Sequence, residues 1–179
     1  MIDKPKKDVT FAYHQLLNVG LGKYSRGIVS VISRETGTIV LKSASATIVA
    51  NINDYIPELQ QHITIYRTFP TVNAIVQPYA KYATVFSQIG LDIPMLGTFH
   101  EDYFASDIPC LHSFNDLKHT FIEQNINPSQ TSAVLLIRQG AFAWGYTLEE
   151  AINNANLLEE VASLAYLSLQ IDPGLISYK

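Results

Sequence analysis

Apolar and β-branched residues cluster in short runs along the chain, and the first two runs lie at 27–33 and 38–42. The intervening segment, 34–37 (Arg-Glu-Thr-Gly), ends in glycine, so the two runs predict a β-hairpin. We expect the strand at 141–145 to turn back beside the strongly apolar strand at 132–138 that precedes it. Further strands are expected at 74–76, 94–99, 132–138 and 141–145.

Other segments carry apolar residues at three- and four-residue spacing, the period of an amphipathic helix. The clearest is the last, where Thr147 and Glu150 form a capping box and the apolar positions from Ile152 onward share one face. The segment 172–174 (Asp-Pro-Gly) ends this helix. Further helices are expected after Pro57 (apolar Leu59, Ile63, Tyr66 and Phe69), after Pro78 (apolar Tyr82, Val85, Phe86 and Ile89) and at 116–125.

The first helix is expected at 8–19, with Asp8 or Thr10 as its N-cap. Its apolar side should consist of Phe11, Leu16 and Leu17. Mixed strands and helices with an early hairpin indicate an α/β or α+β sandwich around one sheet. The length of 179 residues suits a single domain, 1–179.

Composition describes a globular protein, because 47% of the residues are hydrophobic and 16% are charged. No run approaches the roughly 20 apolar residues that span a bilayer, so a membrane partner is not expected. The net charge of -4 and the scattered Lys and Arg residues argue against nucleic acid as a partner.

Two local features bear on localisation. The basic start, residues 1–7, is not followed by the apolar segment of a signal peptide, so we interpret it as a solvated tail. The single cysteine, Cys110, excludes an intrachain disulfide and a cysteine-rich zinc site, and it fits a reducing, cytoplasmic compartment. We expect it to be a small buried residue rather than a nucleophile.

Taken in order, these segments resemble the class II aldolase/adducin family, and within it the L-ribulose-5-phosphate 4-epimerases. The stretches that carry the resemblance are 33–42, 62–90, 97–110 and 134–162. The resemblance implies a central, mostly antiparallel sheet flanked by helices. It also implies a homotetramer with active sites between neighbouring subunits.

The resembled enzymes make or break a carbon–carbon bond beside a ketone, and a zinc ion stabilises the resulting negative oxygens. Three histidines hold this zinc, two in a His-x-His at a strand exit and one before a glycine in a late strand. Here these positions are Gln77, Tyr79 and Gln139. Carboxamides and phenols are poor zinc ligands, so we expect the zinc site to be absent and no cofactor to replace it.

This chain also departs from the family pattern at the positions that form the phosphate pocket. The family's Gly-Asn-x-Ser reads Gly-Ile-Val-Ser at 27–30, with Ile28 in place of the Asn. Its Pro-Ser-Gly corresponds to Ser-Ala-Ser at 43–45, and its Ser-Ser to Ile-Pro at 56–57. The sequence ends at Lys179, before the tail that brings a Tyr and a His to the epimerase site.

Polar residues persist at other positions of the resembled site: Glu58, Lys42, Ser30, Thr98 and Asp102. Glu58 matches the proton-moving carboxylate, and Asp102 matches a catalytic Asp of the epimerases. Lys42, Ser30 and Thr98 match substrate-binding positions. Structural explanations stay open, since Glu58 would stabilise a helix N-terminus, Lys42 could end a strand at the surface and Asp102 could cap a loop.

Three functions are compatible with these residues. The first is a non-catalytic pseudoenzyme, that is, an assembly or ligand-binding module of this family. The second is a zinc-independent sugar-phosphate binder or aldolase/epimerase that uses Glu58, Lys42 and Asp102. It predicts an open, polar cleft that is positively charged near Lys42. The third is an enzyme with a relocated metal, for which Glu58 and His62 or residues 100–102 are the candidates.

Overall fold

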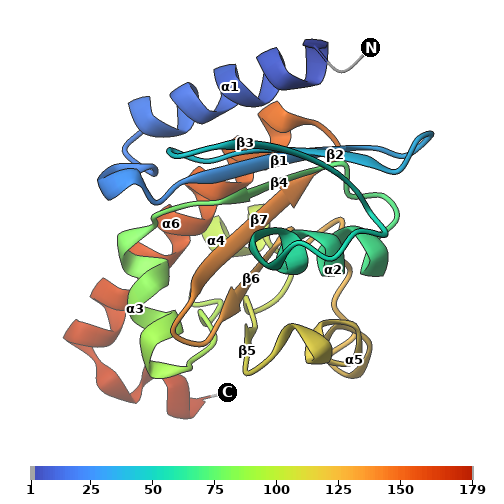
Figure 1. Cartoon of the computed structure of the whole chain (residues 1–179). Helices are drawn as coiled ribbons and strands as arrows, with labels where there is room; N and C mark the ends of the chain where they lie inside the picture. Colours follow the sequence, from blue (N-terminus) through green and yellow to red (C-terminus); the bar gives the residue numbers. More distant parts are fainter. Residues whose placement is uncertain (1–2, 179) are drawn as a thin grey trace.

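The computed structural model describes residues 3–178, which form a 7-stranded sheet between two layers of helices (Figure 1). The strand order is β3-β2-β1-β4-β7-β6-β5, and all neighbours pair antiparallel except β5 and β6. The mostly antiparallel sheet expected from the sequence is therefore confirmed. The strands are β1 (Ile28–Ser33), β2 (Thr38–Lys42), β3 (Thr47–Asn51), β4 (Ala74–Gln77), β5 (Cys110–Leu111), β6 (Ala133–Leu136) and β7 (Gly140–Gly145).

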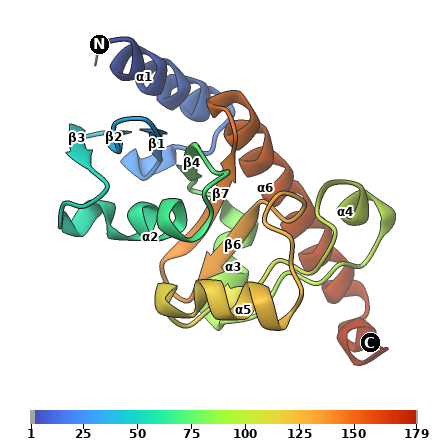
Figure 2. The same ribbon diagram turned by 90° about the vertical axis from the view of Figure 1, so that its right-hand side faces the viewer.

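Helices cover both faces of the sheet (Figure 2). Helices α1, α3 and α6 share one hydrophobic core with the sheet, and α2 and α5 share the other. The helices are α1 (Asp3–Asn18), α2 (Gln60–Thr68), α3 (Lys81–Ile89), α4 (Thr98–Tyr103), α5 (Leu117–Glu123) and α6 (Leu148–Ile171). Short 3₁₀ turns are η1 (Lys23–Ser25), η2 (Pro57–Leu59), η3 (Phe114–Asp116) and η4 (Pro173–Tyr178).

Strand alternation explains the two cores. In β1, Val29 faces the core of α1 and α6, whereas Ile28 and Ile32 face the core of α2 and α5. Successive side chains of a strand point to opposite faces, so a central strand covered on both sides must be apolar at nearly every position. The run Ala133–Leu136 in β6 is buried at each position for this reason.

The hairpin of β1 and β2 is confirmed, with Ser33 opposite Thr38 across the turn. The return of β7 beside β6 is also confirmed. Two strands were not predicted: β3, in which only Ala50 is buried, and β5, which has 2 residues. The expectation of a strand at 94–99 is wrong. Only an isolated bridge joins Ile93 to Ile108, and Thr98 already begins α4.

The first helix differs most from its prediction. Helix α1 begins at Asp3, so neither Asp8 nor Thr10 is its N-cap. The basic residues from Lys4 onward belong to the helix rather than to a tail, while positions 1–2 lie outside the described residues. Leu16 is buried as expected, but the rest of the buried stripe differs. It consists of Val9, Ala12, Tyr13 and Leu16, whereas Phe11 and Leu17 are exposed.

The predicted helix after Pro57 is confirmed, since its four apolar positions are all buried. The helix after Pro78 is confirmed as α3, although Ile89 is exposed. The helix at 116–125 is confirmed as η3 and α5.

The start of α6 is held tightly against β7. The Thr147 side-chain oxygen accepts from the Glu150 backbone N–H at 3.1 Å, and the Glu150 carboxylate accepts from the Tyr146 N–H at 2.8 Å. A Cβ on Gly145 would lie 2.8 Å from the backbone nitrogen of Ala151, so only glycine fits here without displacement. Within the described chain no helix has the length and apolarity needed to cross a membrane.

Candidate functional site

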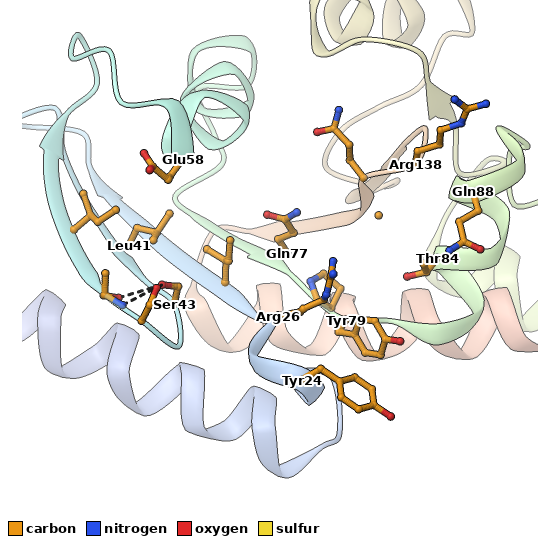
Figure 3. A pocket seen from close by; sticks show the side chains of 17 residues that line it. Tyr24, Arg26, Leu41, Ser43, Glu58, Gln77, Tyr79, Thr84, Gln88 and Arg138 are labelled. Atoms are coloured by element: carbon orange, nitrogen blue, oxygen red, sulfur yellow. Dashed lines mark hydrogen bonds between the residues drawn. The ribbon is translucent and has the colours of Figure 1, made fainter.

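A cleft of about 880 Å³ opens where several chain segments meet at one end of the strands (Figure 3). Its walls come from η1 and the start of β1, the β2–β3 hairpin, η2, the exit of β4, helix α3 and the β6–β7 turn. The exit of β4 forms the middle of the cleft. The strand ends at Gln77 because the next residue, Pro78, has no backbone N–H to donate to a neighbouring strand. The backbone then turns, and Tyr79 N–H donates to the Leu21 carbonyl at 2.7 Å.

The structure brings the three positions that match zinc ligands into this one cleft. Gln77, Tyr79 and Gln139 all line it. The Gln139 side-chain oxygen accepts a hydrogen bond from the Gln61 amide at 2.7 Å. The Tyr79 ring packs edge-on against Tyr24, with ring centroids 5.4 Å apart. Both side chains are thus engaged with neighbouring protein groups.

These donors do not fit zinc. A carboxamide oxygen is a weak neutral ligand, and a phenol with a pKa near 10 must first ionise. Between Asp3 and Tyr178, no group of three or more His, Cys, Asp and Glu side chains is arranged to hold a metal ion. The three residues 100–102 accordingly form no such group, and of the pair Glu58 and His62 only Glu58 lines the cleft, since His62 is fully buried.

Glu58 lines the cleft, in the first turn of the helical segment that begins at Pro57. Lys42 does not line it. Since Leu41 faces the cleft, the next residue of β2 must face the other side of the sheet. There the Lys42 ammonium lies 5.6 Å from the centroid of the Tyr13 ring on α1.

Ser30 is fully buried beneath α2 and is not a lining residue. It forms hydrogen bonds with His62 Nδ1 at 2.7 Å and with the Tyr66 hydroxyl at 2.8 Å. Burial lowers the pKa of His62 to about 4, while the side chain of Gln77 acts in the opposite direction. Burial also raises the pKa of Tyr66, against the smaller effects of Ser30 and Arg34. His62 Nε2 has no hydrogen-bond partner in the part of the chain described.

Thr98 and Asp102 lie on α4, which contributes no residue to the cleft of the same chain. Both side chains are exposed. Their predicted roles in substrate binding and catalysis therefore stay predictions, as do those of Glu58, Lys42 and Ser30. The expectation about the C-terminal tail concerns Lys179, which lies outside the described residues.

The sequence did not indicate two cationic residues of the cleft, Arg26 and Arg138. Arg26 directly precedes the segment 27–30, and Arg138 directly precedes Gln139, so each is the neighbour of a position that the resemblance had marked. Arg138 has a positive φ of 60°, which non-glycine residues seldom adopt. In the described chain, no carboxylate oxygen lies within 4.0 Å of either guanidinium.

The β2–β3 turn, which matches the phosphate-binding turn of the resembled family, uses its hydroxyls internally. Ser43 Oγ accepts from the Ala46 N–H at 3.2 Å and lies 3.3 Å from Ser45 Oγ. Both serines line the cleft, and Figure 3 shows Ser43 at the same end as Glu58 and Leu41.

The single cysteine lies away from the cleft. Cys110 is half-buried in β5, and its backbone N–H donates to Asp92 at 2.7 Å. Desolvation, and secondarily the Asp92 charge, raises the pKa of the Cys110 thiol to about 11. The thiol is therefore protonated at neutral pH, which supports a packing role rather than a nucleophilic one.

Comparisons with known proteins agree with this architecture. The model of the family described as Class II Aldolase and Adducin N-terminal domain matches residues 34–166. An L-fuculose 1-phosphate aldolase superposes with a TM-score of 0.76 at 20% identity, covering 95% of this chain and 88% of that one. The L-fuculose-1-phosphate aldolase from Thermus thermophilus gives 0.73 at 20% identity, covering 95% and 97%.

A sugar-phosphate aldolase from Thermotoga maritima gives a TM-score of 0.66 at 15% identity, covering 96% of this chain and 97% of that one. At these identities the structural likeness establishes the fold alone. The closer resemblance to the 4-epimerases stays a prediction.

Proposed function

The chain belongs to the class II aldolase and adducin N-terminal domain family, and from this membership we propose that it binds a small anionic ligand in the cleft without zinc-dependent catalysis. One observation carries the proposal. The cleft is open, its lining is partly polar and partly apolar, and it contains Arg26 and Arg138, while carboxamides and a phenol occupy the three positions matched to zinc ligands. Sugar phosphates are the first candidates, because aldolases for such compounds share the fold.

The chemistry explains why ligand binding and zinc catalysis separate here. Cleavage next to a ketone places negative charge on oxygen, and a bound Lewis acid stabilises that charge by several kcal/mol. Gln77, Tyr79 and Gln139 can donate or accept hydrogen bonds to a hydroxylated ligand, but they are not Lewis acids and do not replace the charge of a metal ion. The cleft is therefore suited to recognition of the ligand.

The competing proposal is a zinc-independent enzyme that uses Glu58, Lys42 and Asp102. It requires a positively charged cleft near Lys42. Of the three residues only Glu58 lines the cleft, and the positive charge comes instead from Arg26 and Arg138. We therefore favour the ligand-binding module, and we propose in addition that it assembles as a homotetramer in the cytoplasm.

Metal content and turnover test the proposal together. Protein purified without chelator should contain far less than one zinc per chain, and it should not convert L-ribulose 5-phosphate or L-fuculose 1-phosphate. A sugar phosphate at 100 times its Kd should stabilise the fold by about 2.7 kcal/mol in a thermal-shift titration. One zinc per chain, with turnover that EDTA abolishes, would overturn the proposal.

A gain-of-metal variant provides a sharper test. Gln77→His, Tyr79→His and Gln139→His together place three imidazoles in the cleft, and zinc binds imidazole nitrogen well. We expect this triple variant to acquire zinc, measured by mass spectrometry of the metal after dialysis. The matched control, Arg26→His with Ser45→His and Gln88→His, places three imidazoles on three separate segments that line the same cleft and should acquire much less. Equal zinc in both variants would contradict the assignment of the three positions.

A further inference from the structure

The two ends of the cleft differ in charge and polarity. Figure 3 shows Glu58, Leu41 and Ser43 at one end and Thr84, Gln88 and Arg138 at the other, with Gln77, Arg26 and Tyr79 between them. The first end carries the only carboxylate among the lining residues, and the remainder of the cleft carries both guanidinium groups. A bound anion therefore experiences a potential that changes sign along the cleft.

Both arginines are available to a ligand. Each is exposed, and neither has a carboxylate within 4.0 Å in the chain from Asp3 to Tyr178. An arginine that is not neutralised by a neighbouring acid can form charge-assisted, bidentate hydrogen bonds with a carboxylate or phosphate. Gln88 lines the same end and can donate a neutral hydrogen bond from α3, whereas the Thr84 hydroxyl already donates to the Ala80 carbonyl at 2.5 Å.

The β2–β3 end is unfavourable for an anion. The Glu58 charge repels one, and the Ser43 hydroxyl already bonds within its own turn. The apolar lining residues here are Leu41 and its partner on β3, Ile48, and the apolar wall continues to Ile28, which lies opposite Gln77. This end is better suited to an uncharged, apolar part of a ligand.

We propose that the cleft binds a small organic anion with its carboxylate or phosphate at the Arg26–Arg138 side and its apolar end over Ile28 and Ile48. This inference rests on the proposed ligand-binding function and specifies it. It also reverses the orientation implied by the resemblance, in which the phosphate lies at the β2–β3 turn. The Glu58 charge, the apolar wall and the internally hydrogen-bonded β2–β3 turn lie side by side. Together they make that end unfavourable for the anion.

Calorimetric titration with defined probes tests the orientation. The probes are inorganic phosphate, butyl phosphate, pentanoate and ribitol 5-phosphate. Butyl phosphate should bind at least tenfold more tightly than inorganic phosphate, and ribitol 5-phosphate should also bind more tightly than inorganic phosphate, because Gln77 and Gln139 can form hydrogen bonds with its hydroxyl groups. The comparison of butyl phosphate with pentanoate then decides which of the two anionic groups the site prefers.

Variants assign each end. Arg26→Gln and Arg138→Gln should each weaken butyl phosphate binding at least tenfold. Lys7→Gln on the exposed face of α1 removes the same charge outside the cleft and should change binding less than twofold. The pair Ser43→Ala and Ser45→Ala should also have less than a twofold effect. Ile48→Asn should weaken butyl phosphate but not inorganic phosphate.

The outcomes separate this inference from the function on which it rests. If the arginine variants bind as the wild type does, or if the serine pair loses tenfold, the orientation is wrong although a ligand still binds. If the wild-type chain binds none of the probes at millimolar concentration, the ligand-binding function itself fails. Arg138→Asn, which tolerates the positive φ, replaces Arg138→Gln should the latter not fold.

Discussion

Arg138 combines an unfavourable backbone conformation with a side chain that lines the cleft. It is the third residue of a turn closed by the Gln139 N–H donating to the Leu136 carbonyl at 3.0 Å, and its φ is 60°. Glycine or asparagine is favoured at such a position. We therefore expect Arg138→Asn to raise the free energy of unfolding by about 0.5–1 kcal/mol while it weakens anion binding.

Urea denaturation measures the first effect and calorimetry the second. Arg67→Asn is the control, because Arg67 lies in α2 and has no positive φ to relieve. This control should lower the free energy of unfolding, because it removes a good helix former and the hydrogen bond that the Arg67 guanidinium donates to the Ile52 carbonyl at 2.6 Å. A clear loss of stability in Arg138→Asn would show instead that the arginine side chain supports the fold.

His62 makes stability depend on pH. It is fully buried with a pKa of about 4, whereas a histidine in the unfolded chain titrates near 6.5. The unfolded state therefore binds more protons between these values, and stability rises with pH across that window. Between pH 7 and pH 5 the wild type should lose about 2 kcal/mol more than His62→Gln, as measured by urea denaturation at each pH. Parallel pH profiles for the two proteins would refute this origin of the dependence.

At the scale of elements, Glu159 of α6 fixes the start of α3. Its carboxylate accepts from the Tyr82 N–H at 2.9 and 3.0 Å and from the Ala83 N–H at 3.1 Å. Desolvation raises the pKa of Glu159 despite these hydrogen bonds. Because the first N–H groups of a helix lack partners within it, an acceptor from another helix acts as a cap.

Glu159→Ala should therefore cost about 1–2 kcal/mol of stability, whereas Glu159→Gln, which keeps one acceptor oxygen, should cost less. Glu160→Ala, at an exposed position of the same helix, is the control and should have little effect. Since α3 carries Thr84 and Gln88, hydrogen exchange at its first turn should increase in Glu159→Ala alone. Unchanged exchange there would show that α3 does not depend on this cap.

The elements that could be predicted from the sequence are those with strong periodicity. The two β-branched runs joined by the turn at 34–37, and the capping box at Thr147, both led to correct elements. Strand β3 was not predicted because it has few buried positions, and β5 was not predicted because two residues are too few to show a hydrophobic pattern. The segment 94–99 is apolar, but Thr98 enters a helix whose packing depends on distant residues of α6.

At the scale of the whole molecule, the resemblance located the centre of the cleft but not its charge. Gln139 is far in sequence from Gln77 and Tyr79, and all three still line one cleft, as the family order implied. Arg26 and Arg138 could not be found in this way, because neither occupies a position marked by the resemblance. Their common location follows only from the fold, which brings the start of β1 and the β6–β7 turn to one end of the strands.

The proposed tetramer predicts an apolar contact surface on the outside of the molecule. Helix α6 is buried along one side, yet Leu164, Leu167 and Ile171 on its outer stripe are exposed by 45%, 50% and 87%. Apolar side chains at i, i+3 and i+7 lie on one helix face, and such a face is stabilised when a second copy covers it.

Light scattering at micromolar concentration should give the mass of a tetramer for the wild type. Leu164→Glu with Leu167→Glu should lower this mass, whereas Ile122→Glu on α5, a residue exposed by 69%, should not. A wild-type mass equal to one chain would exclude the tetramer, and an unchanged mass in the α6 variant would place the interface on another face.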